Sequence, residues 1–135
     1  LINMVVDIER LGDYAKNIVD LAINHPDTII TENISDDLFT MEKEIHDRFE
    51  KTIQAIQAHD IELAKDLKAR YKYEISKKSD AIVNGIISGE INDFRDPSRA
   101  AAIALYARYL KRLGSHLNNI ATTLVNPFDT IGYAQ

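Results

Sequence analysis

The stretch PSRAAAIALYARYLKRLGSHLNNIATTLV, residues 97–125, sets the architecture of this chain. Its large apolar residues recur at alternating three- and four-residue steps: Ile103, Tyr106, Leu110, Leu113, Leu117, Ile120 and Leu124. This heptad spacing predicts one long amphipathic helix, because it places the apolar side chains on a single face. Asp96-Pro97 before it provides an N-cap followed by proline at the first helical position, and Asn126-Pro127 provides a stop.

Three further segments carry the same helical periodicity, residues 1–23, 35–58 and 61–88. In the first of them the apolar residues are Val5, Ile8, Leu11, Ala15, Ile18 and Ala22. Only AHD, residues 58–60, separates the second segment from the third, and so short a connection makes neighbouring helices antiparallel. We therefore predict an all-α fold, an antiparallel bundle of four helices with Leu113 and Leu117 in its core. An extended coiled coil is the alternative.

Composition limits the classes of function. The 135 residues are 45% hydrophobic and 27% charged, as in an ordinary globular domain, and the net charge is −5. This charge argues against nucleic acid as a partner. The absence of cysteine excludes disulfides and thiolate metal sites, and no apolar run is long enough to insert into a membrane. The chain begins at Leu1 directly in helical pattern, so we interpret it as a piece of a longer polypeptide.

Two similar stretches, ERLGDYAKNI at residues 9–18 and KRLGSHLNNI at residues 111–120, lie 102 positions apart and indicate a duplicated unit. In the first copy Glu9, Asp13 and Asn17 lie four residues apart and so share one helix face. Two carboxylates and a carboxamide suit iron, manganese or magnesium, which makes these three residues the candidate metal ligands. The second copy has Lys111 and Ser115 instead of the carboxylates, so this site is expected to be lost.

Other interpretations of these residues remain open. Glu9 and Asp13 also fit a solvated helix face, and a second row of Glu42, His46 and Glu50 has the same four-residue spacing. An enzyme is not expected, because no histidine has glutamate three residues before it and no phosphate-binding loop or nucleophile motif occurs. A purely structural helical interaction module is a further alternative, in which the tyrosines serve an interface: Tyr14, Tyr71, Tyr73, Tyr106 and Tyr109.

The string DIERLGDYAKNI, residues 7–18, resembles the signature of the PhoU family of phosphate-uptake regulators. RYLKRLGSHLNNI, residues 108–120, resembles the same signature in a degenerate form, and AHDIELAKDL, residues 58–67, resembles a helix–helix corner of that family. The resemblance implies two three-helix repeats. Residues 1–24 are then the last helix of a first repeat, 35–125 the complete second repeat, and 126–135 a C-terminal tail. It also implies that Glu9 and Asp13 match acidic metal ligands.

The ending SHLNNIATTLVNPFDTIGY, residues 115–133, resembles the cytoplasmic PhoU-like domain of bacterial sodium/phosphate cotransporters. The resemblance implies a non-catalytic, cytoplasmic regulatory domain, associated with the membrane through a phosphate transporter in the same chain or in a separate one. A free-standing regulator of an ABC phosphate transporter is the alternative. Whether the domain forms a homodimer is left open.

Overall fold

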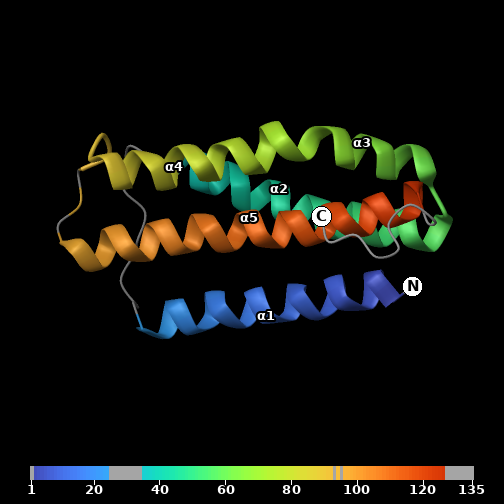
Figure 1. Ribbon diagram of the computed structural model, residues 1–135, viewed down its shortest axis with the longest axis horizontal. Helices are drawn as coiled ribbons and strands as arrows, with labels where there is room; N and C mark the ends of the chain where they lie inside the picture. Colours follow the sequence, from blue (N-terminus) through green and yellow to red (C-terminus); the bar gives the residue numbers. More distant parts are fainter. Residues whose placement is uncertain (1, 25–34, 93, 95, 127–135) are drawn as a thin grey trace.

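The computed structural model describes residues 2–24, 35–92, 94 and 96–126. These residues form the elements α1 (Ile2–Asn24), α2 (Ser35–Ala58), α3 (Ile61–Tyr71), the π-helical turn η1 (Lys72–Ser76), α4 (Lys77–Ser88) and α5 (Pro97–Val125). Figure 1 shows that α2 and α5 run in one direction, whereas α1 and the rod formed by α3, η1 and α4 run in the other. The predicted all-α antiparallel bundle of four helices is confirmed. Apart from Asn126, the predicted tail lies outside the described residues.

Local interactions set the ends of the helices, among them the N-cap that the sequence predicted at Asp96. Asp60 and Asp96 each accept an N-capping bond from a backbone N–H three residues later, at 3.0 Å and 2.8 Å. Gly89 ends α4 with a φ of 83°, a left-handed conformation that costs glycine little because it has no Cβ. His59 also has a positive φ, of 50°, and the chain reverses there between α2 and α3.

The π-helical turn η1, within the rod of α3, η1 and α4, was not predicted. The spacing of the core residues along this rod explains why the turn forms. Leu67, Tyr71, Ile75 and Ser79 follow one another at three successive four-residue steps. Each such step turns an α-helical side chain by about 40°, so Ser79 would lie about 120° away from Leu67 around the helix. A π-helical turn takes up an additional residue and compensates for this drift. Ser79 and Ile82 are accordingly buried together with Ile75.

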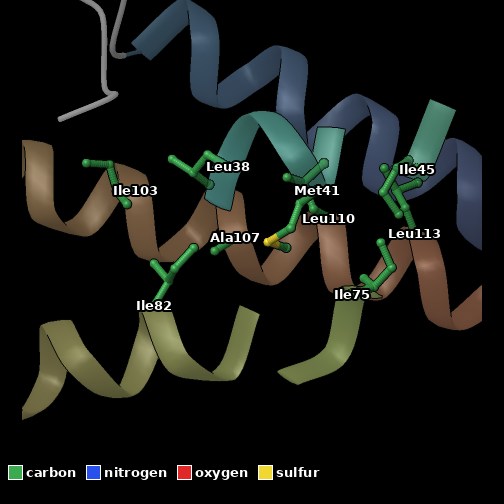
Figure 2. Close-up of a cluster of buried hydrophobic side chains, with 9 residues drawn as sticks. All are labelled: Leu38, Met41, Ile45, Ile75, Ile82, Ile103, Ala107, Leu110 and Leu113. Carbon is green, nitrogen blue, oxygen red and sulfur yellow. The ribbon is translucent and has the colours of Figure 1, made fainter. Parts of the chain in front are cut away.

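Helix α5 is the centre of the bundle and contacts α1, α2, α3, η1 and α4. Its inward face forms the main core with residues of α2, η1 and α4, as Figure 2 shows: Leu38, Met41, Ile45, Ile75, Ile82, Ile103, Ala107, Leu110 and Leu113. Towards the end of α5, Ala64, Leu67 and Ala121 form a second cluster. The core prediction for Leu113 and Leu117 is confirmed, since their exposed fractions are 5% and 3%.

Helix α1 packs along α5 on the side opposite the α3–α4 rod (Figure 1). Leu11, Tyr14 and Ile18 face the core, as their contacts with it show. Five other large apolar residues of α1 are about half exposed or more: Val5 56%, Val6 49%, Ile8 53%, Val19 57% and Ile23 71%. Helix α5 therefore covers only part of the predicted apolar stripe. The exposed apolar residues form what we name the open face of α1.

Leu113→Ala should lower the free energy of unfolding by about 2–5 kcal/mol, because it leaves a cavity in the main core. The measurement is the midpoint of urea unfolding, followed by circular dichroism. Leu105→Ala serves as the matched control, since Leu105 lies on the same helix but is 45% exposed. Equal effects of the two substitutions would contradict the assignment of Leu113 to the core.

Candidate functional site

The candidate metal ligands lie on one side of α1, at the surface. Glu9 and Asp13 are exposed and Asn17 is half-buried. Asp13 also lies 3.6 Å from the Arg10 guanidinium, in an ion pair whose side chains are both more than half exposed and which therefore contributes little stability. Among the described residues, no three histidine or carboxylate side chains converge closely enough to hold a metal ion. The donor set thus fits a hard cation only as an open half-site.

In the second copy of the motif, Lys111 occupies the position of Glu9. Its ammonium Nζ lies 2.7 Å from Oδ1 of Asp80 on α4, and its side chain is only 19% exposed. Where α1 has the exposed carboxylate of Glu9, α5 therefore has a lysine that forms a partly buried ion pair with α4.

The two motif glycines have different surroundings. A Cβ on Gly114 would lie 2.9 Å from Cε1 of Tyr71 and 3.0 Å from Cγ2 of Ile75, so α5 can approach η1 only because this side chain is absent. The Tyr71 ring has little room to move, because its hydroxyl donates to the Lys111 carbonyl at 3.1 Å. A Cβ on Gly12 would meet no atom of the described residues within 4 Å. The contact made at Gly114 thus has no counterpart at Gly12.

The face of α1 that is open corresponds to the face of α5 that is buried. At the offset of 102 positions, Val5 matches Ala107, Ile8 matches Leu110 and Val19 matches Ala121. The three α5 residues are at most 4% exposed, whereas their α1 counterparts are all more than half exposed. Among the described residues, these positions are therefore covered by other helices on α5 and are uncovered on α1.

A buried polar cluster joins α1 to α5, and the sequence analysis missed it. Asp7 is 7% exposed and its Oδ1 lies 2.8 Å from Nδ1 of His116 and 3.2 Å from Nδ2 of Asn119. Tyr14 stacks on the His116 ring at 5.8 Å between centroids. Asp7 lies in register with Leu11 and Tyr14 on the packed side of α1, so a carboxylate in an otherwise apolar stripe was the available signal.

The duplication also relates the contacts within this interface. Asp7 and Tyr109 occupy the same position of the two copies, and so do Tyr14 and His116. Asp7 contacts His116, and Tyr14 contacts Tyr109 with ring centroids 6.2 Å apart. In both pairs, the first of these motif positions on one helix contacts the second on the other helix. Because α1 and α5 are antiparallel, the contact between them has approximate two-fold symmetry.

A second charged cluster surrounds η1. Arg48 of α2 is 1% exposed and donates to the Leu67 carbonyl at 2.8 Å and to Glu74 at 3.1 Å, while Arg70 donates to the other carboxylate oxygen of Glu74 at 2.9 Å. Burial lowers the pKa of Arg48. Burial, followed by the proximity of Glu74, raises the pKa of Glu44. These contacts connect α2 to α3 and to the π-helical turn.

The alternative row on α2 does not converge on one point. Glu42 accepts a hydrogen bond from the hydroxyl of Tyr106, and burial followed by this bond raises the pKa of that hydroxyl. His46 instead lies 3.3 Å from Glu50, with both side chains at least 70% exposed. Within the described part of the chain, no helix is long and apolar enough to span a membrane.

Comparison with protein families identifies a match over most of the bundle. The family described as PhoU domain matches residues 38–124, which is more than half of the chain and runs from the first turn of α2 to the last turn of α5. Neither the curated proteins nor the solved structures include a match to this chain. The matched range contains the main core, Gly114 and the second copy of the motif.

The contrast between the two glycines predicts opposite effects of the same substitution. Gly114→Ala should destabilise the protein, because the new methyl group overlaps Tyr71 and Ile75. Gly12→Ala should stabilise it by about 0.5–1 kcal/mol, because alanine favours an exposed helix more than glycine does. Thermal unfolding of the two variants beside the wild type measures both effects. A stabilising Gly114→Ala would contradict the close approach of α5 and η1.

Proposed function

Because the chain belongs to the PhoU family, we propose that it regulates phosphate uptake as a non-catalytic domain that docks on a membrane phosphate transporter. The match over residues 38–124 carries this proposal, and it relates the domain to the regulation of phosphate transport. The structure adds a rigid bundle whose charged clusters are used for packing between helices. Such a bundle can regulate a transporter by docking more tightly on one of its states, and the difference in docking free energy limits the effect.

The transporter that we propose is a sodium/phosphate cotransporter attached to this domain. The similarity of residues 115–133 to such cotransporter domains and the degenerate second motif support this choice. The alternatives are a free-standing regulator of an ABC phosphate transporter and a purely structural helical module. The first requires a separate transporter protein as partner, whereas the second predicts no response to phosphate, so the partner and the uptake response distinguish them.

We further propose that α1 is the last helix of a first repeat and that residues 35–125 are the second repeat. The open face of α1 supports this, because its equivalent on α5 is covered by α2 and by the α3–α4 rod. A similar helical pair would cover Val5, Ile8 and Val19 and would approach closely at Gly12. Glu9 and Asp13 would then lie beside the covering helices, which could complete the half-site.

The metal proposal concerns Glu9 and Asp13, with Asn17 as a third donor. Glu9→Ala combined with Asp13→Ala should abolish binding of manganese, iron or magnesium and leave helicity unchanged, because both side chains are exposed. Elemental analysis after dialysis against each metal provides the measurement. Glu62→Ala with Asp66→Ala is the matched control, since these exposed residues have the same types and the same spacing on α3. Equal metal content in the wild type and the Glu9/Asp13 variant would contradict the site.

The regulatory proposal predicts the effect of removing this domain from its transporter. Sodium-driven uptake should continue, but its dependence on the phosphate supplied during growth should be lost, because the docking partner is absent. Uptake of radioactive phosphate by cells grown at low and at high phosphate measures this. The control is the full-length protein with Leu105→Ala, an exposed position outside the proposed sites. Identical uptake of the truncated and full-length proteins under both conditions would favour the structural module.

A further inference from the structure

In the α3–η1–α4 rod the carboxylates are paired, whereas three exposed lysines have no carboxylate partner among the described residues. Its carboxylates from Asp66 to Asp80 all pair with arginine or lysine: Asp66 with Arg70 at 3.1 Å, Glu74 with Arg70 at 2.9 Å and with Arg48 at 3.1 Å, and Asp80 with Lys111 at 2.7 Å. Arg48 and Lys111 belong to α2 and α5, so two of these three carboxylates are neutralised from within the bundle.

Three lysines of the same rod, Lys68, Lys72 and Lys77, are exposed and form what we name the lysine row. Among the described residues none of the three has a carboxylate partner, whereas Lys65 pairs with Glu62 at 3.5 Å. Tyr73 lies within the row and is 64% exposed, with the Lys77 ammonium 4.6 Å from the centre of its ring. The row therefore combines unneutralised positive charge with an exposed aromatic ring, in a chain whose net charge is −5.

We propose that the lysine row is a docking surface for the anionic face of a lipid bilayer. The row covers ten residues of continuous helix, which is about 14 Å at the usual rise. The rod forms one long edge of the molecule, opposite α1 (Figure 1). Lys68 and Lys72 lie four residues apart, and the Lys77 ammonium lies over the ring of Tyr73, so the row follows this stretch of the rod. Acidic residues elsewhere on the chain repel the anionic bilayer only over short distances, because the Debye length is about 8 Å at physiological ionic strength.

The side chains in the row suit a bilayer better than a protein or nucleic-acid partner. Lysine keeps its ammonium among lipid headgroups while its aliphatic stem lies against apolar surface, and tyrosine prefers the same interfacial depth. Arg70 is the one arginine of this rod, and its planar fork, which would recognise a carboxylate or phosphate specifically, is instead occupied by Asp66 and Glu74. The inference depends on the charge distribution of this chain and is independent of the proposed role in phosphate uptake.

Flotation of the full chain with vesicles tests the inference. Wild type should bind phosphatidylserine-rich vesicles at low salt, should not bind pure phosphatidylcholine vesicles, and should be released by high salt. Lys68→Glu, Lys72→Glu and Lys77→Glu combined should weaken binding by at least on the order of a hundredfold, since each lysine near an anionic surface contributes about a factor of five. Circular dichroism checks folding, which should persist because the three side chains are exposed.

The matched control combines Lys16→Glu, Lys43→Glu and Arg108→Glu, which changes the net charge equally at exposed positions on α1, α2 and α5. This variant should retain most of the vesicle binding. Equal loss in both variants would overturn the proposal, because net charge alone would then explain binding. Failure of the wild type to bind phosphatidylserine while it binds polyglutamate through the lysine row would overturn it in favour of an acidic protein partner. Since the vesicles contain no transporter, neither result bears on the proposed phosphate regulation.

Discussion

The enclosure of α5 is the constraint on which the rest of the structure depends. A helix surrounded on several sides needs small residues where its neighbours come close and large apolar residues in the spaces between. On α5 these small residues are Ala102, Ala107, Gly114 and Ala121, and all four are buried. The contact at Gly114 places η1 against α5 so closely that a single methyl group would collide with it. This contact determines the position of the α3–η1–α4 rod, and with it the shape of the core.

The bounds of the helices could be predicted because the information is local. Asp60, Gly89 and Asp96 act on backbone groups within a few residues of themselves, and apolar periodicity identifies the faces that pack. The π-helical turn was missed, although the four-residue steps from Leu67 to Ser79 carry its signal. Apolar periodicity shows which positions pack together, but not that four-residue steps carry them around a straight helix and away from the core.

The polar contacts between helices could not be predicted in the same way. Asp7 and His116 are 109 positions apart, and Tyr106 and Glu42 are 64 apart, so only the folded structure identifies each partner. The sequence could show that a carboxylate at position 7 interrupts an apolar stripe, but not what neutralises or solvates it. For the candidate metal ligands the sequence fixes a common face of α1, and the structure adds that this face is at the surface.

The two motif copies differ in their acidic residues because, among the described elements, α5 is packed on several sides and α1 is not. A charge at position 111 lies between α5 and α4, where it needs an opposite charge, and Asp80 provides one for lysine but would repel glutamate. Ser115 lies beside the hydroxyl of Tyr71, whose pKa is already raised by burial, so a carboxylate there would add an unfavourable charge in a partly buried place. Glu9 and Asp13 face solvent on α1, where carboxylates need no internal partner. Packing therefore disfavours an acidic pair at positions 111 and 115 of α5, whereas the exposed positions 9 and 13 of α1 tolerate one.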